Sequence, residues 1–116
     1  MKISTIKDIL NAEVIVPARD MDAEVNLACA SDMMSDVLAF VKDQAVLLTG
    51  LCNPQVIRTA GMMDMKCVVL VRGKRPDPLM AKLAEEYDIA LLASSCHMYV
   101  ACGLLYEGGL RPVKGC

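Results

Sequence analysis

Three short apolar runs constrain the fold of this chain more than any other feature of its sequence. They cover residues 45–48, 67–71 and 89–93, and none of them contains a charged or strongly polar side chain. A strand with one face in water alternates apolar and polar residues, whereas a strand covered on both faces is apolar throughout. We therefore predict three central strands of a sheet that helices cover on both faces.

Two matching helix-start signals follow the first two runs. Asn53-Pro54 and Asp77-Pro78 each place a capping side chain before a proline at the first helical position. Apolar residues then recur at helical spacing: Val56, Ile57, Ala60 and Met63 after the first signal, and Leu79, Met80, Leu83, Ala84 and Tyr87 after the second. Strands that alternate with helices in this way predict an α/β fold with a mainly parallel sheet, in one domain that spans residues 1–116.

Weaker patterns complete the predicted order of elements. Residues 25–29 alternate in burial preference and predict a strand at an edge of the sheet. Ser94 or Ser95 is in position to cap the last helix. Residues 111–116 include proline and glycine and predict a frayed tail.

Charge and composition restrict the partners and the compartment. The net charge is −2, so the chain lacks the basic surface on which nucleic-acid binding usually depends. No apolar run approaches the ~20 residues that cross a bilayer, and the first residues lack the layout of a secretory signal. The six cysteines can form disulfides in a secreted chain, but without a signal we expect reduced thiols in the cytoplasm.

Polar and basic side chains follow the predicted strands where each strand ends. In a parallel sheet these ends share one edge, and ligands bind beyond that edge. The predicted site consists of nine residues: Ser31, Asp32, Thr49, Gly50, Asn53, Arg72, Lys74, Arg75 and Ser95. The turn after Thr49 offers backbone N–H groups at a helix start, and the three cations suit a phosphate or carboxylate. The alternative is an ordinary capped turn and solvated loop charge, since both standard nucleotide-binding glycine fingerprints are missing.

Cysteines suggest a second interpretation of the same edge. Cys29, Cys52 and Cys96 fall near predicted strand ends, where thiolates can hold zinc or an iron–sulfur cluster. The chain has no C-x-x-C pair, however, and buried cysteine as a small apolar residue explains the thiols more simply. His97 is the only histidine, and the motifs G-x-S-x-G and H-E-x-x-H are missing. We therefore expect no enzymatic activity and no cofactor.

Five segments resemble a known family. They are ASDMMSDV (30–37), LLTG (47–50), NPQVIRTA (53–60), VRGKRP (71–76) and ACGLLY (101–106). They resemble a stand-alone DRTGG domain, with a similarity that extends over residues 13–110, and in particular the small proteins encoded beside iron-only hydrogenases. Only Thr49-Gly50 of the D-R-T-G-G string is present, followed by Leu51.

This resemblance implies an α/β domain like the N-terminal domain of HPr kinase/phosphorylase. It implies a regulatory, ligand-sensing role, a homodimer and a small anionic or nucleotide-like ligand, because related DRTGG domains accompany nucleotide-binding CBS domains in some pyrophosphatases. Two alternatives stay open. One is an iron–sulfur or metal-binding accessory protein associated with hydrogenase, and the other is a protein–protein interaction module that docks through its methionine-rich surface.

Overall fold

The computed structural model describes residues 1–40 and 44–113, and this part of the chain forms five helices and six strands. In chain order they are α1 (Ile3–Ile9), β1 (Glu13–Val16), β2 (Leu27–Ala30), α2 (Met34–Phe40), β3 (Ala45–Thr49), α3 (Pro54–Met62), β4 (Cys67–Leu70), α4 (Pro78–Glu86), β5 (Ala90–Ala93), α5 (Met98–Glu107) and β6 (Arg111–Pro112). The three apolar runs form β3, β4 and β5, as predicted.

The six strands form one sheet in the order β1-β5-β4-β3-β2-β6. Neighbouring strands are parallel except for β1 and β5, so the predicted mainly parallel α/β fold is confirmed. The register places Thr49 beside Leu70 and Leu70 beside Ala93. Strands β3, β4 and β5 therefore end side by side, and the turns that follow them meet at one edge.

Two predictions about the margin of the sheet were wrong. β2 is not an edge strand, because β6 pairs with it and places Arg111 opposite Leu27. The tail is not frayed at Arg111–Pro112, and the Val113 N–H donates to the Ala28 carbonyl at 3.1 Å. Helix α5 brings the chain back beside β2, and the short strand β6 then pairs with the edge of β2 that faces away from β3. Residues 114–116 of the predicted tail lie outside the described residues.

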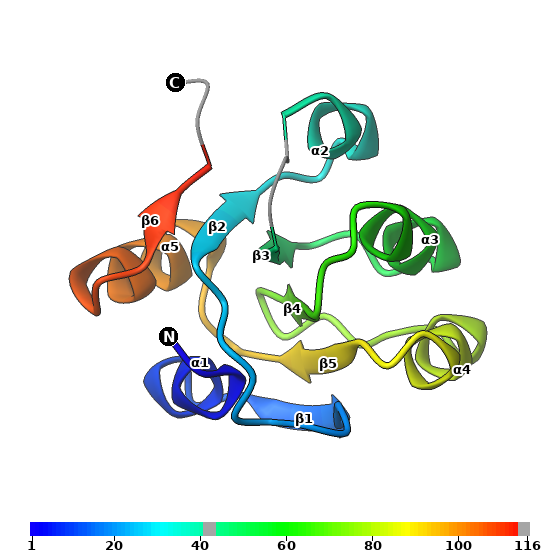
Figure 1. Ribbon diagram of the computed structural model, residues 1–116, viewed down its shortest axis with the longest axis horizontal. Helices are drawn as coiled ribbons and strands as arrows, with labels where there is room; N and C mark the ends of the chain where they lie inside the picture. The colour runs from blue at the N-terminus through cyan, green and yellow to red at the C-terminus, as the bar shows by residue number, and fades with distance from the viewer. Residues whose placement is uncertain (41–43, 114–116) are drawn as a thin grey trace.

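Helices cover both faces of the sheet, as Figure 1 shows. Helices α2, α3 and α4 lie over one face, and α1 and α5 lie over the other. Leu47 and Val68 point into the first apolar layer, and their neighbours Val46 and Val69 point into the second. The sheet therefore separates two aliphatic cores, which explains why its central strands are apolar except for Thr49, the last residue of β3.

The two predicted helix starts are correct. The Asn53 side chain accepts a hydrogen bond from the Gln55 N–H at 3.0 Å at the start of α3. The Asp77 side chain accepts one from the Met80 N–H at 2.9 Å at the start of α4. Each cap precedes a proline, whose missing N–H costs nothing in the first turn of a helix.

The predicted inward stripes are only partly correct. In α3, Val56, Ile57 and Ala60 are buried as predicted. In α4, Met80 and Ala84 are buried, but Leu79 and Tyr87 are each 47% exposed. Leu79 lies in the first turn of α4, and Tyr87 follows its last residue with its ring over Gly61 of α3, so both lie at the ends of the helix rather than over the core.

Helix α5 begins later than predicted. Its first residue is Met98, and His97 stands at the N-cap without a side-chain capping bond, so neither Ser94 nor Ser95 caps it. With 10 residues it is the longest described helix. Over residues 1–40 and 44–113, no helix has both the length and the apolar character needed to span a membrane.

Candidate functional site

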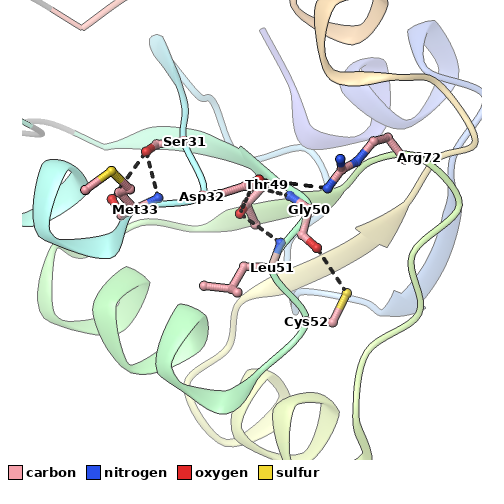
Figure 2. A network of polar contacts seen from close by, with 8 residues as sticks. All are labelled: Ser31, Asp32, Met33, Thr49, Gly50, Leu51, Cys52 and Arg72. Atoms are coloured by element: carbon pink, nitrogen blue, oxygen red, sulfur yellow. Dashed lines mark hydrogen bonds and ion pairs between the residues drawn. The ribbon is translucent and has the colours of Figure 1, made fainter.

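Asp32 occupies the centre of a polar network at the carboxyl edge of the sheet (Figure 2). It follows β2, and its Oδ1 accepts the Thr49 hydroxyl at 3.0 Å and the Gly50 N–H at 2.7 Å. Because β2 and β3 are parallel neighbours, their ends meet, and a residue after one strand reaches the turn after the other. The predicted meeting of Asp32, Thr49 and Gly50 is therefore confirmed.

Thr49 joins the carboxylate to the turn that follows β3. Its side chain is fully buried, and its hydroxyl oxygen also accepts the Leu51 N–H at 3.1 Å. Together with the Gln55 N–H, which Asn53 accepts, three backbone donors of this turn bond within the chain. The Gly50 and Leu51 donors of the predicted turn are therefore occupied, whereas the Cys52 and Asn53 N–H groups have no hydrogen bond among the described residues.

Arg72 brings positive charge to this network. Its guanidinium lies over Gly50 so closely that a Cβ on Gly50 would collide with Nη2. The distance from Nη2 to Oδ2 of Asp32 is 3.8 Å, and both side chains are about half exposed, at 44% and 51%. A pair this long and this exposed is weak, so the guanidinium remains accessible to a ligand.

An unusual backbone conformation positions Arg72. Its φ angle is +61°, in the left-handed region that side chains other than glycine rarely adopt. The Arg72 N–H donates to the Cys96 carbonyl at 2.7 Å, and the Gly73 N–H donates to the Ser94 carbonyl at 2.9 Å. These two bonds tie the turn after β4 to the turn after β5, and they hold the strained residue in place.

The other two cations of the predicted site differ in position. Lys74 is exposed, and within the described residues its side chain has no hydrogen bond or ion pair. Arg75 instead donates two hydrogen bonds to the carboxylate of Glu13, at 3.2 and 3.0 Å. This pairing holds the pKa of Glu13 below its usual value. Arg75 therefore extends towards β1, and the predicted three-cation clamp is reduced to Arg72 and Lys74.

Ser31 and Ser95 do not join the network as ligand-orienting groups. The Ser31 hydroxyl accepts the Met33 N–H at 2.9 Å, and this bond stabilises the turn just before α2. Ser95 is exposed and has no hydrogen bond within the described part of the chain. Ser94, which the site prediction omitted, is 2% exposed and donates its hydroxyl to the Leu10 carbonyl at 2.8 Å. A contact across 84 positions in the sequence leaves no local signal.

The three thiols of the alternative metal site are not brought together. Among the described residues, no three His, Cys, Asp or Glu side chains lie close enough to hold a metal ion. Cys52 Sγ donates to the Gly50 carbonyl at 3.5 Å, whereas Cys96 Sγ lies 3.9 Å from the Leu10 carbonyl. Burial raises the pKa of Cys29 and of Cys52 above that of a free thiol, which disfavours the thiolate that binds metals.

Comparison of the chain with protein families and with curated proteins gave no match. Among solved structures it is similar to the crystal structure of the CBS and DRTGG domains of the regulatory region of Clostridium perfringens pyrophosphatase, complexed with the activator diadenosine tetraphosphate. The TM-score is 0.73 and the sequence identity is 14%, over 90% of this chain and 45% of that chain. This chain thus spans less than half of that chain's length. It shares the fold of part of that CBS and DRTGG region, as its sequence resemblance implied.

Proposed function

We propose that this protein is a non-enzymatic regulatory domain that senses a small anionic, nucleotide-like ligand at the carboxyl edge of its sheet. The observation that carries the proposal is the Arg72 guanidinium, which is held over Gly50, half exposed, with only a 3.8 Å contact to Asp32. Arginine binds phosphate through two parallel hydrogen bonds. A phosphate that approaches from solvent can replace the distant carboxylate as its partner.

Two further side chains give the proposed site its polarity. Lys74 lies two residues after Arg72, is exposed, and adds a second positive charge to the same loop. Oδ2 of Asp32 faces Arg72 while Oδ1 binds the turn, so Oδ2 can accept a hydroxyl group from a ligand. A nucleotide carries both groups that this site would bind: a phosphate for Arg72 and Lys74, and a sugar hydroxyl for Asp32.

The structural comparison supports the choice of ligand class. The similar pyrophosphatase region was crystallised with diadenosine tetraphosphate as its activator. At 14% identity the two chains share a fold rather than a site, so we use the comparison to select the first nucleotides for testing.

The hydroxyl and thiol groups of the edge favour sensing over catalysis. The Thr49 and Ser94 hydroxyls both donate to oxygens within the chain, and burial raises the pKa of Cys52, which leaves its thiol protonated at neutral pH. Thr49, whose partner is a carboxylate, is fully buried and closed to a substrate, and the Ser94 and Cys52 groups donate to backbone carbonyls rather than to a base, so these groups lack what an activated nucleophile needs. A homodimer, a cytoplasmic location and an association with hydrogenase stay predictions of the sequence.

A thermal-shift panel tests the proposal. Purified protein is scanned with ATP, GTP, diadenosine tetraphosphate and tripolyphosphate, beside Arg72→Ala and the matched control Arg75→Ala, which removes the same charge three residues further along the loop. A ligand at 100 times its Kd raises the midpoint on the order of 10 °C. We expect this rise for at least one nucleotide in the wild type and in Arg75→Ala, and its loss in Arg72→Ala. A flat panel, or an equal rise in all three proteins, contradicts the proposal.

A further inference from the structure

Helix α5 carries more apolar surface than the sheet covers. Its ten residues, MYVACGLLYE, contain a single charged side chain, Glu107. Ala101 and Leu105 are buried against the sheet, but Tyr99 is 90% exposed and Tyr106 is 57% exposed. A helix that is apolar all round is normally buried all round. The outer face of α5 is therefore suited to contact with another protein surface.

A glycine lies in the middle of this outer face. Tyr99, Gly103 and Tyr106 follow at steps of four and three residues, so they share one side of the helix. A Cβ on Gly103 would have no atom within 4 Å in the described structure. Glycine weakens a helix interior relative to alanine, and no contact among the described residues compensates here. The missing side chain at Gly103 leaves a notch between Tyr99 and Tyr106, where the backbone of a second helix can approach closely.

The order of residues on this face fits a second copy of the same helix. The pattern of tyrosine, glycine and tyrosine reads almost the same in both directions, with its midpoint at Cys102–Gly103. Two antiparallel copies that cross at this midpoint place each Tyr99 beside the partner's Tyr106. Such a contact is isologous, as in most symmetric dimers.

A recess beside Tyr106 is large enough for an aromatic ring. Its volume is about 160 Å³, and it lies between α5 and the strands β2 and β6, with Cys102 and Tyr106 on the helix side. A cavity of about 150 Å³ accommodates benzene. The Tyr106 ring is held in position because the Arg111 guanidinium stacks 4.3 Å from its centre. The recess and the fixed ring therefore form a receptor for the exposed Tyr99 of a second copy.

The charge on α5 also favours an antiparallel copy. Glu107 is the last residue of the helix, at the negative end of the helix dipole, where a carboxylate is unfavourable. In the antiparallel pair it lies near the amino-terminal, positive end of the partner helix. No other charged side chain in α5 opposes the contact.

We propose that two copies of this protein form a symmetric dimer through antiparallel α5 helices that cross at Gly103. Tyr99 of each copy packs against Tyr106 and the adjoining recess of the other. A buried tyrosine contributes roughly 200 Å², so at these exposures the two rings supply about a third of the ~800 Å² per partner of a standard interface. Val100 and Leu104, at 49% and 36% exposed, lie on one flank of this face and widen the apolar surface around the helix.

Sedimentation velocity over a concentration series tests this interface. The wild-type chain is compared with Tyr99→Lys, with Gly103→Gln, and with the control Met62→Gln, which changes a 72% exposed apolar side chain on α3. We expect a dimer for the wild type and Met62→Gln. Loss of the Tyr99 anchor in one variant, and a side chain where the helices cross at Gly103 in the other, should each raise the dissociation constant at least roughly 30-fold. Circular dichroism checks that each variant is folded, as expected for exposed positions.

Two results overturn the inference. The first is a wild-type chain that stays monomeric at the highest concentration, which leaves α5 without a second copy. The second is a dimer that Tyr99→Lys and Gly103→Gln leave as stable as the control, which places the interface on another surface. Neither result bears on the Arg72 site, because α5 and that site are tested by separate variants.

Discussion

Two buried hydroxyls at the same edge of the sheet, those of Thr49 and Ser94, have nearly the same local geometry but donate to different kinds of group. Thr49 ends β3 and Ser94 follows β5, and they are 0% and 2% exposed. Each hydroxyl oxygen accepts the N–H two residues further on, at 3.1 Å from Leu51 and 3.2 Å from Cys96. Each therefore shapes the first turn after its strand.

The difference lies in the group to which each hydroxyl donates. Ser94 donates to the Leu10 backbone carbonyl, a neutral group just after α1, and thereby fastens α1 to the sheet. Thr49 donates to the Asp32 carboxylate, a half-exposed charged group that faces Arg72. The same motif thus stabilises the fold at one strand end and orients a charged, accessible site at the other. Variants of the two turns separate these roles.

Ser94→Ala should produce the largest loss of stability. It removes the donor to the Leu10 carbonyl and the acceptor of the Cys96 N–H in a buried position, where an unsatisfied polar group costs about 1–3 kcal/mol. Urea denaturation measures this loss as a lower midpoint. Nucleotide affinity should stay at the wild-type value, and a large affinity loss in a folded variant would show that Ser94 belongs to the site.

Thr49→Val should cost less stability, about 1 kcal/mol. The Leu51 N–H loses its acceptor, but the Asp32 carboxylate keeps the Gly50 N–H and is exposed enough for water to replace the lost hydroxyl. The same urea experiment measures the difference. If Thr49→Val were as damaging as Ser94→Ala, the contrast between the two turns would be wrong.

Gly50→Ala should affect binding with little effect on stability. The added Cβ collides with the Arg72 guanidinium, the flexible end of a side chain that can swing into solvent. Nucleotide affinity should therefore fall as in Arg72→Ala, about tenfold or more, as expected when a charge-assisted hydrogen bond is lost. Calorimetric titration with ATP measures the affinity, with Arg72→Ala measured under the same conditions.

Arg75→Ala should have the smallest effect, and that effect should depend on pH. Arg75 lowers the pKa of Glu13 in the folded protein, so the pair stabilises the fold at neutral pH and loses its effect as the pH falls through the lowered pKa. We expect a slightly lower melting midpoint than wild type at pH 7, and a difference that shrinks as the pH falls through the lowered pKa of Glu13. A larger difference at acidic pH than at neutral pH would contradict the pairing.

Much of this edge could be predicted, because parallel strands must end together. The apolar runs identify β3 to β5 and the alternating pattern identifies β2, and the ends of β2, β3 and β4 bring Asp32, Thr49, Gly50 and Arg72 into one network. The positions of Arg75 and Ser94 could not be predicted. Arg75 leaves the site because the chain turns through two left-handed residues, Arg72 and Gly73, and Ser94 meets Leu10 through a contact that only the folded chain creates.

The most direct measurement of the central claim is calorimetric titration of diadenosine tetraphosphate and ATP into the wild type, Arg72→Ala and Arg75→Ala under identical conditions. Both variants lose one positive charge from the same loop. Arg72→Ala removes the guanidinium over Gly50, whereas Arg75→Ala removes the guanidinium that is paired with Glu13. We predict saturable binding that Arg72→Ala weakens about tenfold or more and that Arg75→Ala leaves unchanged. Equal affinities in all three proteins, or no binding to the wild type, would contradict a nucleotide site built on Arg72.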